Sequence, residues 1–211
     1  MKLLVATRSA GKQAEVRRLL GGPALEVVFP DDAGVFPTPA EALLELGESF
    51  AANARAKAEY FAKQTGLPTV ADDSGLEVFA LGGEPGVRSR RWAGVDGAEP
   101  DVEAANNAKL LSRLRGAPEA KRRARYRCVL VLYRTARAIP ETFEGTCTGR
   151  ILEEPRGTGG FGYDPLFWSD DLKRSFGEAT ATEKDAVSHR GRAFAALRAA
   201  LEPKAETEPT T

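Results

Sequence analysis

The chain has 211 residues, of which 30 are Lys or Arg and 30 are Asp or Glu, so its formal net charge is zero. This balance argues against a nucleic-acid binder, because such proteins neutralise phosphates with a broad positive field. Apolar runs such as 129–133 are too short to cross a membrane, and the apolar segment within residues 1–12 is too short for a signal peptide. With only two cysteines, Cys128 and Cys147, we expect a cytoplasmic protein whose thiols are buried.

Strand and helix patterns alternate through the first third of the chain. In order, we expect a strand, a helix, a second strand, an irregular segment and a long helix, over residues 2–7, 15–20, 25–29, 30–47 and 49–64. Three prolines discourage long elements in the irregular segment. Ser49 suits the N-cap of the long helix, and Gly66 suits its end.

The rest of the chain carries further strands and two helices. We expect a brief strand that runs into an Asp-Asp-Ser-Gly sequence, a following strand, a helix, two longer strands and a final helix, over residues 68–71, 76–80, 100–115, 124–134, 142–152 and 188–201. Because strict βαβ repetition is missing, we predict an α/β fold with a mixed central sheet flanked by helices. We expect a single domain over 1–202 and a polar, flexible tail over 203–211.

Residues 7–12, Thr-Arg-Ser-Ala-Gly-Lys, lie between a predicted strand and a predicted helix. Backbone N–H groups at a helix start favour an anion, and Lys12 and the hydroxyls of Thr7 and Ser9 would add donors. The segment does not match a Walker A sequence. The alternative interpretation is an ordinary strand-to-helix turn with a solvated lysine.

Asp72 and Asp73 follow a predicted strand and precede Ser74. Neighbouring residues of a strand point to opposite faces, so only one of the two carboxylates is well placed to face a given site. Mg²⁺ is the natural partner for such groups, because it is held by one or two carboxylates together with substrate phosphates. The alternative is a solvated, aspartate-rich turn.

Ser49, Asn53 and Lys57 recur at every fourth residue of the long predicted helix, with Glu45 just before it. Residues four apart lie on one helix face, so this polar stripe forms either a site wall or the solvent-facing side. In the first case Glu45 could be a second metal ligand.

Four glycines surround Phe161 in the segment 157–165, Gly-Thr-Gly-Gly-Phe-Gly-Tyr-Asp-Pro. Glycines let a backbone approach a flat ligand, and they leave the phenylalanine ring free to stack on it. Asp164 is a candidate partner in reading a base. The alternative is a hairpin-like loop with Phe161 tucked into the core.

His189 is the only histidine and stands beside Arg190, downstream of Lys184. A lone histidine near a helix start is commonly structural or exposed. Next to two cationic residues, it instead suggests a positive end of a site for an anionic or carbonyl-bearing ligand.

Together these segments resemble the inosine triphosphate pyrophosphatase family. The most specific are Ala-Asp-Asp-Ser-Gly-Leu at 71–76, the glycine-rich segment 157–165, and Ser-His-Arg-Gly at 188–191. The resemblance covers residues 3–201 and includes Ser-Phe-x-x-Asn-Ala at 49–54. It implies a two-lobed fold with an active-site cleft, and Mg²⁺-dependent hydrolysis of ITP, dITP and XTP to the monophosphate and pyrophosphate. It also implies a homodimer.

The resemblance further implies a role for each candidate residue. The phosphates are held by Thr7, Arg8, Ser9, Ala10, Gly11 and Lys12. Glu45 and Asp73 bind the metal, and Asp73 is also the base. Lys57 assists catalysis on the phosphate side, and Asn53 and Ser74 bind substrate. The base is held by Phe161, Gly162, Tyr163, Asp164, Lys184, His189 and Arg190.

One departure from the family pattern lies in the first loop, which usually reads Thr/Ser-Gly-Asn-x-x-Lys. Here Arg8 and Ser9 replace the glycine and the asparagine. Ser9 can still donate a hydrogen bond, but Arg8 lacks the backbone freedom of glycine and adds a charge. We therefore expect the geometry of phosphate binding by this loop to differ from that in the rest of the family.

Hydrogen-bonding edges suggest how the base would be selected. Hypoxanthine and xanthine present an N1–H donor and an O6 acceptor, whereas adenine presents the reverse. An acceptor such as Asp164 and a donor such as Arg190 or Lys184 suit the first pattern and oppose the second. Guanine shares this pattern, so rejection of GTP must come from its 2-amino group.

Two other functions stay open at this point. One is a Maf-like pyrophosphatase for pyrimidine or modified nucleotides, of related architecture. The other is a nucleotide-binding or RNA-binding module without turnover, supported by the basic segment 121–127. We interpret that segment as a solvated strand entry or a dimer rim.

Overall fold

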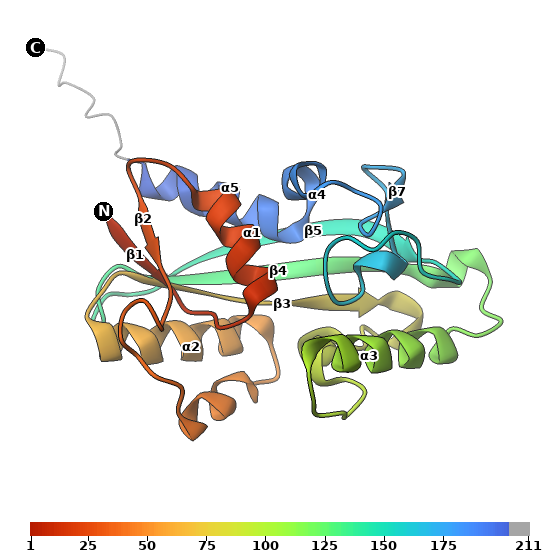
Figure 1. Cartoon of the computed structure of the whole chain (residues 1–211), viewed down its shortest axis with the longest axis horizontal. Coiled ribbons are helices and arrows are strands. Elements are labelled where there is room, and N and C mark those ends of the chain that lie inside the picture. Colours follow the sequence, from red (N-terminus) through yellow and green to blue (C-terminus); the bar gives the residue numbers. More distant parts are fainter. Residues whose placement is uncertain (203–211) are drawn as a thin grey trace, which may run out of the picture.

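The structure is a computed structural model that describes residues 1–202, so the tail expected at 203–211 lies outside the described residues. Seven strands form one sheet in the order β2-β1-β3-β4-β5-β6-β7 (Figure 1). Their bounds are β1 Lys2–Val5, β2 Glu26–Val28, β3 Thr69–Val78, β4 Arg123–Tyr133, β5 Glu141–Ile151, β6 Phe167–Ser169 and β7 Arg174–Ser175. β1 pairs in parallel with β2 and β3, whereas all later neighbours are antiparallel. The predicted mixed sheet is confirmed.

Helices cover both faces of this sheet. They are α1 Ala10–Leu20, α2 Phe50–Thr65, α3 Glu99–Arg113, α4 Ala181–Val187 and α5 His189–Leu201. In Figure 1, α1, α4 and α5 lie above the sheet, and α2 and α3 lie below it. Short 3₁₀ segments lie between these elements and the strands, namely η1 Pro39–Glu45, η2 Phe79–Leu81, η3 Gly86–Arg91, η4 Glu119–Arg122 and η5 Asp164–Leu166. Within residues 1–202, none of these helices combines the length and apolar character that a membrane crossing requires.

The alternation of side chains along β1 distributes the core over both faces. Leu3 and Val5 pack in one cluster with residues of α1 and α5, whereas Leu4 packs in a second cluster with alanines of α2. A third cluster joins the far ends of β3 and β4 to α3, through residues such as Leu76 and Leu110. The clusters at the two ends of the sheet give the molecule its two lobes.

Local signals placed three helices well. Ser49 caps α2 by accepting from the backbone N–H of Ala52, and Gly66 ends it in the left-handed conformation. Ser188 caps α5 through the backbone N–H of Gly191. α3 begins one residue earlier and ends two residues earlier than predicted. The predicted start of α1 was wrong by five residues, because Ser9 already serves as its cap.

The prediction of two strands flanking Asp72 and Asp73 was also wrong. β3 runs unbroken over ten residues, because β4 pairs with it from Thr69 to Val78. The ladder is made by backbone groups, so polar side chains do not interrupt it. The two aspartates consequently lie in the middle of a central strand, where both are buried.

Candidate active site

A cavity of about 390 Å³ lies between the lobes, where the start of α1, the middle of β3 and the 157–165 loop meet. Most of the candidate residues line it, namely Thr7, Arg8, Ser9, Lys12, Glu45, Lys57, Asp73, Ser74, Phe161, Gly162, Tyr163, Asp164, Lys184, His189 and Arg190. Three others do not line it: Gly11 lies against the Phe161 ring, Asn53 bonds to Asp73, and Ala10 is exposed. Sequence segments more than 100 residues apart thus converge on one cleft.

The start of α1 presents its first turn to the cavity. Ser9 Oγ accepts from the backbone N–H of Lys12 at 3.5 Å, and Thr7 Oγ1 accepts from the backbone N–H of Ser9 at 3.3 Å. Both hydroxyls therefore support the turn itself. The Lys12 Nζ lies 3.0 Å from Asp72 Oδ2. The positive end of the helix and one lysine meet at this wall, which is an arrangement that favours an anion.

Asp73 and Glu45 flank the ammonium group of Lys57. Lys57 Nζ donates to Glu45 Oε1 at 2.9 Å and lies 3.5 Å from Asp73 Oδ1. Asn53 Nδ2 donates to Asp73 Oδ2 at 2.9 Å, while Asn53 Oδ1 accepts from the backbone N–H of Gly47 at 2.7 Å. Of the predicted polar stripe, Lys57 therefore lines the cavity, Asn53 fixes the orientation of the Asp73 carboxylate, and Ser49 is exposed and caps α2.

Charge and burial act against each other in this group. Burial raises the pKa of Asp73 above its ordinary value, and the opposing charge of Lys57 only partly offsets it. Burial would lower the pKa of Lys57, but Glu45 and Asp73 hold it above its ordinary value. The upward shift of the Lys57 pKa favours its charged form, and the upward shift of the Asp73 pKa makes that carboxylate easier to protonate.

The oxygen donors of Glu45 and Asp73 fit Mg²⁺. Residues 1–202 contain no group of three or more His, Cys, Asp or Glu side chains placed to hold a metal ion. Mg²⁺ usually takes only one or two protein carboxylates and completes its shell with water and substrate phosphates. Two carboxylates on the wall of an open cavity are compatible with this mode of Mg²⁺ binding, in which substrate phosphates would supply further ligands.

Asp72 points away from this pair, as the alternation of strand side chains requires. It does not line the cavity. Besides its ion pair with Lys12, its Oδ2 accepts hydrogen bonds from Ser74 Oγ at 3.2 Å and from Arg190 Nε at 3.4 Å. Burial would raise the pKa of Asp72, but Lys12 and Arg190 hold it far below its ordinary value. Asp72 is a buried counter-ion for the cations of the site.

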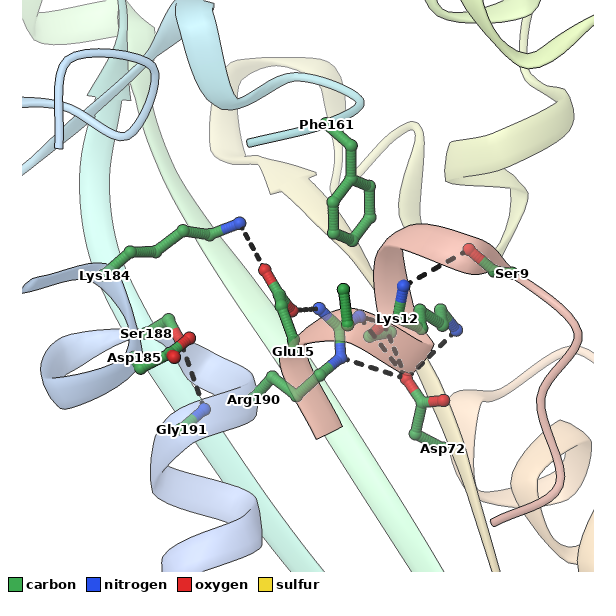
Figure 2. Close-up of polar contacts among 12 residues, drawn as sticks. Ser9, Lys12, Glu15, Asp72, Phe161, Lys184, Asp185, Ser188, Arg190 and Gly191 are labelled. Atoms are coloured by element: carbon green, nitrogen blue, oxygen red, sulfur yellow. Dashed lines mark hydrogen bonds and ion pairs between the residues drawn. The ribbon is translucent and has the colours of Figure 1, made fainter. Parts of the chain in front are cut away.

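Glu15 is a functional-site residue that the sequence reasoning missed. Its carboxylate accepts from Lys184 Nζ at 2.6 Å and from Arg190 Nη1 through the other oxygen (Figure 2). Burial raises the pKa of Glu15, yet Arg190 and Lys184 bring it down to about 2. A signal was present, because Glu15 follows Lys12 by three residues and therefore shares its helix face.

The glycine-rich loop is closed by its own aspartate. Asp164 Oδ2 accepts from the backbone N–H of Phe161 at 2.9 Å and from Lys184 Nζ at 2.5 Å. A side chain at Gly160 would collide with this carboxylate, and the φ of Gly160 is +74°. From the sequence we expected Asp164 to accept a hydrogen bond from the N1–H of the base. In the structure, Asp164 Oδ2 instead binds the loop backbone and Lys184.

Phe161 is half-buried and lines the cavity, so it is not a core residue. Lys184 Nζ lies 4.8 Å from the centre of its ring, and the Arg190 guanidinium lies 5.6 Å away. The ring also rests against the backbone of Gly11, where an added Cβ would lie 2.9 Å from Phe161 Cδ1. The position of this ring therefore depends on a glycine at the start of α1.

His189 also lines the cavity, and its side chain is buried. Its ring stacks on Tyr126 with centres 4.6 Å apart and planes 9° from parallel. Burial, with Arg190 second, moves the pKa of His189 well below its ordinary value, so the ring is neutral. In the part of the chain that the structure describes, His189 Nδ1 has no hydrogen-bond partner.

Arg8 is placed differently from the expectation that it would grip phosphate. Its guanidinium turns toward the 31–41 segment and binds Glu41 and Asp31. The departure from the family pattern therefore introduces a side chain whose donors are already used within the protein.

The mixed sheet, the two lobes and the cleft between them are those of the inosine triphosphate pyrophosphatase class of folds. Residues 3–200 match the model of the Ham1 family, and the chain belongs to that family. The chain is 45% identical to a dITP/XTP pyrophosphatase of Frankia alni, covering 95% of this chain and 97% of that one. It is 46% identical to a dITP/XTP pyrophosphatase of Halorhodospira halophila, covering 93% and 95%.

Solved structures show the same likeness. A HAM1 protein from Coxiella burnetii superposes with a TM-score of 0.82 at 36% identity, covering 95% of this chain and 98% of that one. A nucleoside-triphosphatase / dITP/XTP pyrophosphatase from Mycobacterium abscessus superposes with a TM-score of 0.71 at 44% identity, covering 93% and 98%.

Proposed function

We propose that this chain is a Mg²⁺-dependent pyrophosphatase that hydrolyses dITP, XTP and ITP to the nucleoside monophosphate and pyrophosphate. The observation that carries this proposal is one cleft with two chemically different ends. Lys12, Lys57 and the start of α1 suit phosphates, whereas Phe161 and its loop suit a flat base. The names of the relatives quoted above support dITP and XTP as substrates.

The residues at the phosphate end divide the reaction between them. The N–H groups of the α1 start and Lys12 would stabilise the negative charge that develops on the departing pyrophosphate. Asp73, oriented by Asn53, would align or deprotonate the water that attacks the α-phosphorus. Glu45 and Asp73 would hold Mg²⁺, which supplies charge neutralisation on the triphosphate.

At the base end, Phe161 would stack on the purine, and Lys184 would donate to its O6, because Glu15 and Asp164 take only two of the three N–H donors of its ammonium group. Lys184 is held in place by these two carboxylates, so its remaining donor is oriented before substrate arrives. Adenine carries an amino group where O6 would be, which leaves such a donor unpaired. A buried donor without a partner is costly, so ATP is disfavoured.

The cytoplasmic location and the homodimer are part of the same proposal; the two buried, unpaired cysteines support the first, and the family resemblance supports the second. An RNA-binding role is disfavoured by the ion pairs of the basic segment 121–127. Its outward arginines lie against carboxylates of neighbouring elements, in the pairs Arg123–Asp170, Arg125–Glu77 and Arg127–Glu144. These charges are already compensated and do not form an open positive surface.

Pyrophosphate release from a panel of nucleoside triphosphates, with and without Mg²⁺, tests the proposal. ITP, dITP and XTP should be cleaved far faster than ATP, and only with the metal. A preference for UTP or dTTP would support the Maf-like alternative instead. Salt-sensitive RNA binding without pyrophosphate release would support the binding module, and equal rates for ATP and ITP would refute the selection of the base.

A further inference from the structure

Arg8 is bound through every nitrogen of its guanidinium. Nε donates to Glu41 Oε2 at 2.7 Å and Nη2 donates to Glu41 Oε1 at 2.8 Å, which is a two-pronged ion pair. Nη1 donates to Asp31 Oδ1 at 2.5 Å, and Nη2 also donates to the carbonyl of Val35 at 2.9 Å. All three partners belong to the segment between β2 and α2.

That segment needs a tether. Between the end of β2 and the start of α2, the regular structure consists of η1 alone. A chain of this kind keeps much conformational entropy unless contacts with the rest of the protein restrict it. Arg8 supplies such contacts from the turn between β1 and α1, and its guanidinium also lies 5.7 Å from the ring of Phe61 on α2.

Glu41 transmits this restraint to the site. Its Oε1 also accepts from the backbone N–H of Thr38 at 3.3 Å, which completes a capping box at the start of η1. The last residue of η1 is Glu45, four residues later, and its carboxylate reaches Lys57 in the cavity. The Arg8–Glu41 pair thus connects the phosphate-binding turn to the short helix that carries Glu45.

The charges favour keeping this pair intact. The side chain of Arg8 is 22% exposed and that of Glu41 is 16% exposed, so both are partly shielded from water. The hydrogen bonds with Arg8 lower the pKa of Glu41, and those with Glu41 raise the pKa of Arg8. A phosphate would have to displace two carboxylates to engage this guanidinium.

We infer that Arg8 is a positioning residue that fixes the Glu45-bearing segment 31–45, and that it does not bind the substrate phosphates. The inference rests on the proposed function, in which Glu45 serves the reaction. It reassigns the residue that the family resemblance would place among the phosphate ligands. Glu41, which the sequence did not single out, becomes its functional partner.

A double-mutant cycle separates the two roles. If Arg8 acts through Glu41, Arg8→Gln and Glu41→Gln should each lower kcat/KM by about tenfold, and the double variant should be no worse than either single one. If Arg8 binds phosphate directly, Glu41→Gln should free it and leave activity unchanged or higher, and this outcome would overturn the inference. Arg134→Gln is the matched control, because Arg134 makes a similar two-pronged pair with Glu141 on the exposed β4–β5 hairpin.

Backbone hydrogen exchange without substrate gives a readout that does not depend on turnover. Amides in 35–45 should exchange about tenfold faster in Arg8→Gln and in Glu41→Gln, while those of β3 and β4 stay at wild-type rates. Unchanged exchange in 35–45 would overturn the inference. If the wild-type protein released no pyrophosphate, the proposed function would fail, but the exchange measurement would still decide whether Arg8 fixes this segment.

Discussion

Glu15 of α1 and Arg190 of α5 form a buried ion pair, although 175 residues separate them in the sequence. The other oxygen of Glu15 binds Lys184, and Arg190 also contacts Asp72, so anions and cations alternate through the site. These groups come from α1, β3, α4 and α5. Their mutual attraction therefore joins the strand that carries the carboxylates to the helices that face the base end.

Glu15→Gln should destabilise the protein by about 3 kcal/mol, because Lys184 and Arg190 would keep their buried charges without this counter-ion. Urea unfolding at pH 7 measures the loss. The matched control is Glu144→Gln, whose pair with Arg127 is exposed and should contribute less than about 1 kcal/mol. Equal losses in the two variants would contradict the role given to Glu15.

The same residue predicts acid sensitivity. Because the pKa of Glu15 is lowered to about 2 in the folded protein, its contribution is complete above the ordinary value of 4.5 and is lost as pH falls from there toward 2. The stability difference between wild type and Glu15→Gln should therefore shrink over this range. A difference that stays constant down to pH 2.5 would argue against the ion pairs as its source.

His189 should make stability depend on pH in a milder range. Its folded-state pKa lies well below 6.5, so below that pH the unfolded chain binds a proton that the folded chain does not. Stability should fall with decreasing pH from 6.5, by at most about 1.4 kcal/mol per pH unit from this group. Since His189 is the only histidine, His189→Phe should remove this slope between pH 6.5 and 5.5. Urea midpoints at several pH values test it, and an unaltered slope would refute it.

Asp73→Asn should lower kcat by about 10²–10⁴-fold while leaving the fold intact. The substitution preserves shape and an oxygen that can accept from Asn53, but removes the charge and the proton acceptor. Pyrophosphate release and the circular dichroism spectrum are the measurements. Asp170→Asn, in an exposed pair with Arg123, is the control that should keep full activity. Near-normal turnover in Asp73→Asn would remove this residue from the reaction.

Gly11→Ala should raise KM several-fold with little change in kcat or stability. The new methyl group would lie 2.9 Å from Phe161 Cδ1, so the ring must move from the position in which it would stack on a base. Alanine is otherwise favourable within a helix. Gly22→Ala is the control, because a Cβ there meets nothing within 4 Å. An unchanged KM in Gly11→Ala would show that the ring position is unimportant.

Local sequence signals were sufficient where hydrogen bonds form within a few residues. Ser49 and Ser188 identify helix starts because each cap bonds to a backbone N–H three residues later. The capping box of α4, formed by Thr180 and Glu183, is an equally local signal, although we predicted no helix there. β3 was divided in the prediction because its aspartates resemble a turn, whereas the pairing that makes it one strand comes from β4, far along the chain.

The sequence by itself determined which candidate groups the site contains: two adjacent aspartates, a lysine after a strand, a glycine-rich loop around Phe161 and a lone histidine. Only the tertiary structure decided how those groups pair. It turned Arg8 toward Glu41, separated the roles of Asp72 and Asp73, and brought Glu15 into the site. The reason is that the energy of a charge depends on its distance to other charges and on its burial, and both are set by segments distant in sequence.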